Sequence, residues 1–390
     1  MDELKRYKGI KLRIYPTKNQ EYMIQRGFDN ARWLWNQMLG LHIERYRNNK
    51  ISRSLYLSNY DLDYLLPRLK VEFPWLKDSE STSLQQINLQ LHKAFLNFFK
   101  RRGGFPKFKS RRYSKQGYTS KNNNGVIKIL DGHHIKLPKL KKVYYCGSIP
   151  EYSKIKSVTI SKSPTGKYYA SLLVEFENQE FNKTDGVVGI DMGVADLMIT
   201  SDGEKIETIP FEKRLAKQKL VWERKRARRL AIAKKEIAYD LHYNPDNVRT
   251  LEDFSNYQKA RVQVAKINEK IRNQRLDYLH KITTRLIKQY DTIIIEDLSI
   301  KDMMKNHNLA RSIANQSWST IRMMLQYKAD WYGREVIIVP AYKTSQICSN
   351  CGYDDGKHEL KIREWDCPSC KAHHDRDINA ARNILNKAIN

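Results

Sequence analysis

The sequence predicts a multidomain protein in which an α/β domain is joined to an all-helical block and a small β domain. Its 390 residues exceed the roughly 100–200 residues of a typical single domain. The spacing of apolar residues also changes along the chain, from a helical period, to short strand-like runs, and then to strands that alternate with long helices. We therefore expect three kinds of packing in one chain.

The N-terminal part predicts one strand followed by helices. Residues 8–16 alternate polar and apolar side chains and end at Pro16, which is typical of a strand. Over residues 17–99 the apolar residues recur at helical spacing, with breaks expected at Pro67 and Pro74. The apolar residues at this spacing include Phe28, Ala31, Trp35, Leu39, Leu84, Ile87, Leu91, Phe95 and Phe98.

The middle of the chain predicts a small β domain. Its strand-like runs, with a turn at residues 163–166, indicate a barrel or sandwich. They cover residues 125–130, 134–137, 155–161 and 168–177. Because the first strand precedes the helices, we expect the helical block to be inserted into this β domain. Cys146 stands alone here and is expected to be a buried, small apolar residue.

The remainder predicts an α/β layer, because strands alternate with helices. The expected strands are residues 187–190, 197–203, 292–295 and 335–339, and the expected helices are residues 211–239, 251–290 and 312–332.

The chain is strongly basic. Seventy-one Lys and Arg against 43 Asp and Glu leave a net charge of +28, so a polyanion such as nucleic acid is the expected partner. No run approaches the roughly 18 apolar residues of a membrane span, and the N-terminal residues have no apolar signal core. We expect neither a membrane protein nor a secreted one, and predict a cytoplasmic location.

Two segments concentrate the positive charge. Residues 100–112, which we call the basic connector, contain no acid. Residues 213–235 contain eleven basic side chains. Both can bind phosphates with release of counterions, and the predicted contacts are Lys107, Lys109, Arg111, Arg112, Lys225 and Arg226. Aromatic residues among these charges either stack on unpaired bases or pack in the core. They are Phe108, Tyr113, Tyr118 and Trp222.

Four of the five cysteines form two C-x-x-C pairs. They are Cys348, Cys351, Cys367 and Cys370. In a cytosolic protein this pattern predicts a closed tetrahedral Zn²⁺ site that folds a small module and leaves no position open for catalysis. The loop between the pairs contains Lys361, Arg363 and Trp365, which are suited to contact nucleic acid.

Three acids are candidates for a second metal site. Asp191 and Glu296 each follow an apolar strand, where an unpaired buried carboxylate is costly, and Asp377 lies near a predicted helix start. If they converge, they can hold two Mg²⁺ ions roughly 3.5–4 Å apart and activate water for phosphodiester cleavage. Taken singly, each acid also fits a structural role, as a turn cap, an ion-pair partner and an N-cap, respectively.

Several motifs resemble, in this order, those of the TnpB family of RNA-guided nucleases from insertion sequences, which are relatives of type V CRISPR effectors. Residues 189–193 (Gly-Ile-Asp-Met-Gly) resemble the first RuvC-like motif, residues 293–298 the second and residues 374–381 the third. Further matches extend the resemblance to nearly the whole chain, at residues 12–16, 104–109, 329–333 and 344–352.

The resemblance implies a domain arrangement. It comprises a wedge-type β-barrel (residues 1–16 and 103–184), an inserted helical recognition lobe (17–102), a RuvC-like (RNase H-like) α/β nuclease core (185–344 and 372–390) and a four-cysteine zinc module (345–371). The metal-binding acids on the family pattern are Asp191, Glu296 and Asp377, the last chosen over the nearby Asp375.

The resemblance also implies an activity and its partners. We expect an endonuclease that cleaves DNA with one RuvC-like site, using two Mg²⁺ ions and one structural Zn²⁺. A guide RNA from the transposon end would pair with double-stranded target DNA, and the protein would be a monomer with its RNA, near the nucleoid of a bacterial or archaeal cell. A short DNA motif beside the target is read first. Candidate readers are Gln85, Asn122 and Asn123, since amides bind adenine bidentately, although the two asparagines also fit a simple turn.

Three other functions stay open. A binding protein would engage guide and DNA without cleavage. A junction-resolving nuclease would cut without a guide, but the helical lobe, basic connector and zinc insertion exceed what a minimal RuvC-like core needs. A transposase would need a Tyr or His-hydrophobic-His arrangement for strand transfer, which we do not find in the sequence.

Overall fold

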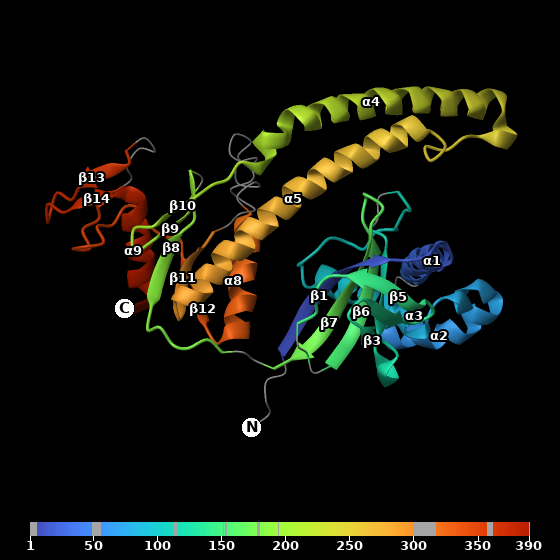
Figure 1. Ribbon diagram of the computed structural model, residues 1–390, viewed down its shortest axis with the longest axis horizontal. Helices are drawn as coiled ribbons and strands as arrows, with labels where there is room; N and C mark the ends of the chain where they lie inside the picture. The colour runs from blue at the N-terminus through green and yellow to red at the C-terminus, as the bar shows by residue number, and fades with distance from the viewer. Residues whose placement is uncertain are drawn as a thin grey trace. The chain divides into compact units, whose positions relative to one another are not determined.

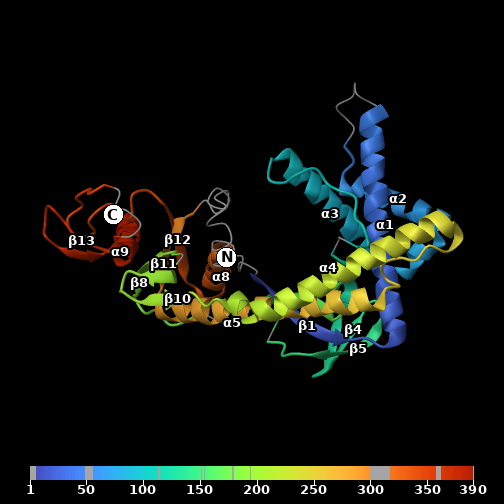
Figure 2. The same cartoon turned by 90° about the horizontal axis from the view of Figure 1, so that it is seen from above.

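The chain forms two compact units, Met1–Glu177 and Asn178–Asn390, each with its own sheet and core (Figures 1 and 2). The computed structural model describes residues 6–48, 56–112, 115–150, 152, 154–177, 180–193, 195–298, 317–356 and 362–389. Among the helices so described, none combines the length and apolar character needed to cross a membrane.

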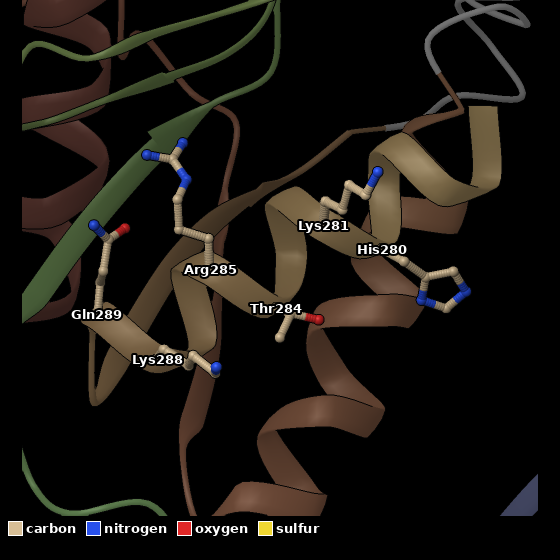
Figure 3. A pocket seen from close by; sticks show the side chains of 6 residues that line it. All are labelled: His280, Lys281, Thr284, Arg285, Lys288 and Gln289. Atoms are coloured by element: carbon tan, nitrogen blue, oxygen red, sulfur yellow. The ribbon is translucent and has the colours of Figure 1, made fainter. Parts of the chain in front are cut away.

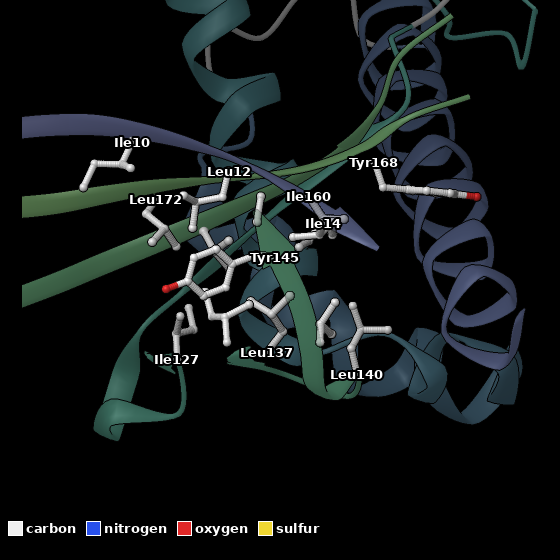
Figure 4. Close-up of a cluster of buried hydrophobic side chains, with 14 of the residues drawn as sticks. Ile10, Leu12, Ile14, Ile127, Leu137, Leu140, Tyr145, Ile160, Tyr168 and Leu172 are labelled. Atoms are coloured by element: carbon white, nitrogen blue, oxygen red, sulfur yellow. The ribbon is translucent and has the colours of Figure 1, made fainter. Parts of the chain in front are cut away.

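The first unit is built on a seven-stranded antiparallel sheet, in the order β2-β6-β7-β1-β5-β4-β3. Its strands are β1 (Arg6–Tyr15), β2 (Gly117–Lys121), β3 (Lys128–Asp131), β4 (His134–Leu137), β5 (Lys141–Cys146), β6 (Lys154–Lys162) and β7 (Tyr168–Phe176). Alternate residues of β1, namely Ile10, Leu12 and Ile14, enter one core with residues of the other strands (Figure 4).

This sheet does not close into the predicted barrel. Its edges are β2 and β3, which are not hydrogen-bonded to each other. The Asn122 side chain joins the chain after β2 to β6 instead, donating to the carbonyls of Ile127 (3.1 Å) and Ile155 (3.0 Å) and accepting from Ile127 N (2.7 Å). Helix α1 (Lys18–Asn48) adds Ile24 and Phe28 to the core. A helix and side-chain hydrogen bonds thus complete the core, so no further strand pairing is required.

In the described part of the chain between β1 and β2, the structure has three α-helices and a short 3₁₀ helix. They are α1, α2 (Asn59–Glu72), η1 (Pro74–Asp78) and α3 (Ser81–Phe99). The break predicted at Pro67 is wrong, because Pro67 lies inside α2. A capping box between Ser58 and Asp61 stabilises the start of α2, and Leu62 and Leu66 are buried in the helical core. Packing and capping therefore outweigh the hydrogen bond that proline removes.

Cys146 is exposed, although the sequence suggested a buried residue. Side chains alternate along β5, so that Val143 and Tyr145 face the core. Cys146 follows Tyr145 and therefore points away from the core.

The second unit is built on a five-stranded sheet in the order β10-β9-β8-β11-β12. The strands β8 (Val187–Asp191), β11 (Thr292–Asp297) and β12 (Glu335–Pro340) are parallel, whereas β9 (Asp196–Thr200) and β10 (Lys205–Glu207) are antiparallel. The helices α5 (Ser255–Gln289) and α8 (Trp318–Tyr332) share one core with the sheet residues Val188, Ile190 and Ile293. Helix α8 matches the described part of the helix predicted at 312–332, and residues 312–316 lie outside the described residues.

A long helix pair extends from this sheet. Helices α4 (Phe211–Tyr243) and α5 lie side by side in both views (Figures 1 and 2). Few residues of α4 are buried; one is Ala233. The pair is therefore a mainly exposed, basic rod of the second unit, which suits a polyanion partner.

Helix α9 (Arg376–Ile389) packs on the opposite face of the sheet, where Ile384 shares a small core with Ile294 and Val339. The helix backbone lies directly against Gly189 of β8. A Cβ atom at residue 189 would contact the carbonyl of Ala381 and would lie 2.6 Å from Leu385 N. Only glycine therefore permits this approach.

We predict that Gly189→Ala forces α9 away from β8 and destabilises the second unit by about 1–3 kcal/mol, the usual cost of overpacking. Gly9→Ala is the matched control, because Gly9 also lies in a strand and nothing lies within 4 Å of its added Cβ. Urea unfolding of both variants measures the difference. Equal midpoints would contradict the close packing.

Candidate functional site

Two of the three predicted acids lie at the same edge of the sheet. In the parallel pair β8–β11, Ile190 is opposite Ile295, so Asp191 and Glu296 follow at adjacent strand ends. Asp377 lies in the first turn of α9. Burial raises the pKa of Asp191 to about 7, and the negative charges of Glu296 and Asp377 add to this effect. The electrostatic coupling means that the three carboxylates share one region.

Glu296 is almost completely buried, with 8% of its surface exposed. Burial raises its pKa, while a hydrogen bond from the Thr344 hydroxyl and the positive charge of Lys387 act in the opposite direction. Thr344 follows β12 and was not selected from the sequence as a site residue. Its hydroxyl orients the Glu296 carboxylate and leaves the second carboxylate oxygen for another partner.

The two neighbouring acids of α9 have different environments. The Asp375 carboxylate accepts from the backbone N–H groups of Asp377 (3.0 Å) and Ile378 (3.0 Å), so Asp375 is the N-cap of α9. It also accepts from Lys205 Nζ at 2.6 Å. The Asp377 carboxylate instead pairs with Arg363 at 3.1 Å. The N-cap role considered for Asp377 therefore belongs to Asp375.

The chemistry of the acid cluster fits divalent cations. The charged form of Asp191 is costly, mainly because the carboxylate is buried and further because Glu296 and Asp377 repel it. A hard divalent ion with oxygen ligands would remove this repulsion. Within the described ranges, the four cysteines form the group of three or more metal-binding side chains that lies close enough together to hold an ion, and the three acids do not form such a group.

The four cysteines lie together as predicted, with all sulfur atoms within 4.8 Å of one another. The Sγ atoms of Cys348 and Cys370 are 3.7 Å apart, and those of Cys351 and Cys367 are 3.6 Å apart. These distances are too long for disulfides. Tetrahedral Zn–S bonds of about 2.3 Å correspond to S···S distances of about 3.8 Å. The cluster therefore fits a closed Zn²⁺ site.

Two side chains pack against the cysteine cluster. His374 Nε2 is 3.0 Å from Cys348 Sγ, and the His374 ring lies 4.8 Å from the Trp365 ring. Both residues are buried. Burial lowers the pKa of His374, so the neutral ring can donate its N–H to a thiolate. Trp365, predicted to contact nucleic acid, is part of this core, and Lys361 lies outside the described residues.

Asparagines of α9 hold the first cysteine pair against the sheet domain. The amide of Asn383 donates to the carbonyls of Thr344 (2.8 Å) and Ile347 (2.6 Å), and that of Asn379 donates to Ile347 (2.8 Å). Asn379 Oδ1 also accepts from Ser349 N at 2.8 Å. Both asparagines are buried, one helical turn apart. The segment that positions Thr344 and leads into the cysteine module is therefore bound to the helix that carries Asp377.

The predicted phosphate contacts differ in exposure. Lys107, Arg111 and Arg112 are exposed. The Lys109 ammonium lies 3.6 Å from the centre of the Trp35 ring, and burial lowers its pKa to about 8, so Lys109 is used largely in packing. On α4, Lys225 and Arg226 are both partly buried, and the ammonium of Lys225 lies 4.7 Å from the Trp222 ring centre.

The aromatic residues predicted to stack on bases also differ in exposure. Tyr118 packs against Phe28, and burial raises its pKa. Trp222 packs against a small cluster that contains Phe211, Ile267 and Ile271. Phe108 is exposed, and Tyr113 lies outside the described residues.

The predicted readers of the adjacent DNA motif lie near one another. Gln85 is exposed on α3, and Asn123 is exposed in the 3₁₀ helix η2 (Asn123–Gly125). The hydrogen bond from Lys121 N to Thr82 Oγ1 (3.0 Å) brings these segments together. Asn122 uses its side-chain amide in the turn described above. DNA reading therefore stays a prediction, and its geometry favours Gln85 and Asn123.

A basic hollow of about 580 Å³ follows one side of α5. Figure 3 shows its lining residues His280, Lys281, Thr284, Arg285, Lys288 and Gln289. Two of its cations are paired with acids, Lys281 with Asp277 and Arg285 with Glu204. The hollow therefore lies on the last turns of α5, and ion pairs partly neutralise its cations.

Three family models match the chain. One described as "Cas12f1-like, TNB domain" matches residues 318–384, one described as "Probable transposase" matches residues 171–307, and one described as "Helix-turn-helix domain" matches residues 1–50. Within the last range, residues 6–48 form one strand and one long helix and no helix-turn-helix. The first two models cover the sheet, both candidate metal centres and the α4–α5 rod.

Curated relatives match over nearly the whole chain. A "Putative RNA-guided DNA endonuclease" of Streptomyces pristinaespiralis is 33% identical over 99% of this chain and 90% of its own length. "Putative RNA-guided DNA endonuclease InsQ" of Escherichia coli K12 is 31% identical over 98% of this chain and 92% of its own. A solved Cas12f1–sgRNA–target DNA complex matches with a TM-score of 0.57 and 15% identity, covering 99% of this chain and all of that one. The chain therefore has a Cas12-like fold of mixed α and β structure.

We predict that Asp191→Asn stabilises the Mg²⁺-free protein most at high pH. The folded pKa of about 7 exceeds the ordinary 3.8, so the unfolded carboxyl ionises first, and the cost of burying its charge grows as pH rises from about 4 to 7. The variant should raise the melting temperature by several degrees at about pH 8 and by less at about pH 5. The control is Asp297→Asn, since Asp297 is 62% exposed. A gain that does not grow with pH would contradict the buried charge.

We predict that Cys351→Ser loses the bound metal and loosens both the cysteine module and the first turns of α9. The reason is the set of hydrogen bonds from Asn379 and Asn383 to the segment around Cys348. Metal analysis and amide hydrogen exchange over residues 345–389 measure the effect. Cys146→Ser is the control, because Cys146 is exposed and outside the cluster. Metal loss with unchanged exchange in α9 would show that the module is not coupled to the helix.

Proposed function

The chain belongs to the TnpB family, and from this premise we propose that it is an RNA-guided DNA endonuclease with one Mg²⁺-dependent site at Asp191, Glu296 and Asp377. The observation that carries the proposal is the placement of Asp191 and Glu296 at adjacent strand ends, with Asp377 near enough for its charge to act on Asp191. The sheet with helices on both faces supports a RuvC-like nuclease core.

Each acid has a defined task in this proposal. Glu296 is held by the Thr344 hydroxyl, so it presents one oxygen in a constant direction. Asp191 lies at the neighbouring strand end, and Asp377 approaches on α9. Asp375 caps the helix and so leaves Asp377 to face the site. Bound Mg²⁺ would activate the attacking water and stabilise the leaving oxygen of the phosphodiester.

Arg363 and Lys387 add positive charge around these acids. Arg363 pairs with Asp377, and Lys387 lowers the pKa of Glu296. Lys387 thus favours the ionised Glu296 carboxylate, the form that a divalent ion requires. Arg363 is more than half exposed, so its guanidinium can exchange the Asp377 carboxylate for a phosphate of a bound strand.

The proposed Zn²⁺ is structural. The four thiolates close the coordination sphere, and His374 donates to one of them. The ion keeps the cysteine module folded against α9, on which Asp377 lies. Its removal should therefore impair cleavage without removing any metal-binding acid.

The proposed partners are a guide RNA and double-stranded DNA. The exposed cations of the basic connector and the α4–α5 rod would bind phosphates, with Gln85 and Asn123 reading the adjacent motif. The relatives' names assign RNA-guided DNA cleavage to them, and their similarity extends over both units of this chain. The wedge-like, lobe, core and zinc-module boundaries given above are part of the proposal.

The alternatives make different predictions about the same protein. A guide-independent nuclease would cut DNA equally well without RNA. A binding protein would not need three mutually repelling carboxylates, whose burial is costly without a cation. The transposase description of one family model would require strand joining, which hydrolysis at a two-metal site does not provide. Cleavage assays with and without copurified RNA separate these cases.

We predict that Glu296→Gln lowers DNA cleavage by at least about 10³-fold, while RNA-dependent DNA binding stays within a few-fold, because the ligand charge is lost but the shape is kept. The control is Asp297→Asn. Asp297 is adjacent on β11, but it is exposed and paired with Arg322, so cleavage should be almost unchanged. Rates are measured on the purified RNA-bound complex with a labelled target.

Cleavage by Glu296→Gln at the rate of the unaltered protein would contradict the active site. Loss of RNA-dependent binding in Glu296→Gln would instead assign this carboxylate to folding or assembly. A strong loss of cleavage activity in Asp297→Asn would show that any charge change at this strand end disrupts the second unit.

A further inference from the structure

Three phenylalanines form an exposed aromatic patch at the end of α3. Phe98, Phe99 and Phe105 are 37%, 59% and 46% exposed, although Phe98 follows the helical spacing of the lobe core. Each ring contacts its neighbours: Phe98 lies 5.6 Å from Phe99 and 5.3 Å from Phe105, between ring centres. We call these three side chains the phenylalanine platform.

The platform rests on a fixed base. Phe95 is buried, and its ring lies 5.6 Å from Phe105 and 6.2 Å from Phe99. Tyr56 contacts the Phe99 ring edge-on at 5.7 Å. Since the rings beneath are packed in the helical core, the exposed rings are held in place before any partner binds, which reduces the entropy cost of binding.

The backbone after α3 explains why Phe105 reaches Phe98. Arg101 has a left-handed conformation (φ 55°), and Arg102 N donates to Asn97 O at 2.8 Å. Arg101 N donates to Phe98 O at 3.0 Å. This pattern is a Schellman motif, which reverses the chain at a helix C-terminus. The reversal returns the following residues toward the last turn of α3.

The connector beyond the platform is anchored to α1. Trp35 Nε1 donates to Lys107 O at 3.0 Å, and Asn36 makes two hydrogen bonds with the Lys109 backbone, of 2.9 and 2.7 Å. Pro106, which directly precedes Lys107, is buried. Phe105 therefore lies on a segment held on both sides, not on a free loop.

The surroundings of the platform are cationic. The exposed side chains of Lys100, Arg101, Arg102 and Lys107 flank it in the sequence, and residues 100–112 contain no acid. An exposed apolar patch of this kind marks a binding surface. Its charge selects a polyanion, and its flat π faces select the bases of that polyanion when they are unpaired.

We propose that the phenylalanine platform binds unpaired bases of a single-stranded nucleic acid segment, while the adjacent cations hold its phosphates. This inference rests on the proposed function for the presence of RNA and single-stranded DNA. It adds a base-stacking site that neither the acids nor the cysteine module supplies. The strand is assigned to the guide RNA, because the proposed DNA partner is double-stranded and offers unpaired bases only after unwinding.

The test measures binding of labelled single strands to the full-length protein carrying Asp191→Ala, stripped of copurified nucleic acid. Probes are a uridine 12-mer RNA, a thymidine 12-mer DNA and a 12-base-pair duplex. Phe99→Ala and Phe105→Ala should each weaken single-strand binding by roughly tenfold, with duplex binding almost unchanged. The salt dependence should keep its slope, because no charge is removed. A larger loss with RNA than with DNA assigns the strand to the guide, and the reverse assigns it to the target.

Two further variants separate stacking from folding and from apolar contact. Phe99→Trp should retain single-strand binding, whereas Phe99→Leu, which keeps much of the apolar volume without a π face, should not. Tyr60→Ala is the control, since Tyr60 is 79% exposed on α2 and outside the platform, and it should bind like the parent protein.

Unchanged single-strand binding in Phe99→Ala and Phe105→Ala would overturn the proposal, as would full binding by Phe99→Leu or an equal loss for the duplex. The readout is strand binding and not cleavage, so a failed cleavage mechanism would leave it intact. Conversely, a phenylalanine platform that binds no strand would not contradict the proposed acid site.

Discussion

The direct contact between α9 and β8 determines where the candidate active site can form. Gly189 has no side chain, so the backbone of α9 lies against the strand, and the first turn of the helix reaches the strand ends. The negative charge of Asp377 thereby acts on Asp191, as does that of Glu296. Any side chain at residue 189 would move the helix, and with it one of the three acids of the proposed site.

The cysteine module depends on the same helix. Asn379 and Asn383 point from α9 to the segment that contains Thr344, Ile347 and Ser349. The same segment orients Glu296 through the Thr344 hydroxyl. One helix therefore connects the strand ends, the capping Asp375 and the first cysteine pair. The proposed zinc site and the proposed catalytic acids are therefore linked by packing and hydrogen bonds, without a shared ligand.

In the first unit, several polar and aromatic groups stay exposed after the core is complete. Its sheet core is completed by α1 and by the Asn122 side chain, which leaves Gln85, Asn123 and the phenylalanine platform as exposed groups of chemical interest. Cations that look equivalent in the sequence are not equivalent in the fold, since Lys109 packs on Trp35 whereas Lys107 is exposed. Charge alone therefore identifies the class of partner, and exposure identifies the residues that can touch it.

The sequence by itself determined the features that depend on spacing along the chain. The C-x-x-C pairs, the alternation of strands and helices, and the acids after apolar strands follow from local periodicity and ligand chemistry, as does the family resemblance. Tertiary structure decided the rest. Pro67 stays within α2, and the first sheet stays open. Cys146 faces solvent, and Phe98 lies in an exposed patch. Each outcome depends on whether residues distant in the sequence pack against the position. The roles of Thr344, His374 and Asn383 likewise arise from contacts between segments far apart in sequence, which no local pattern encodes.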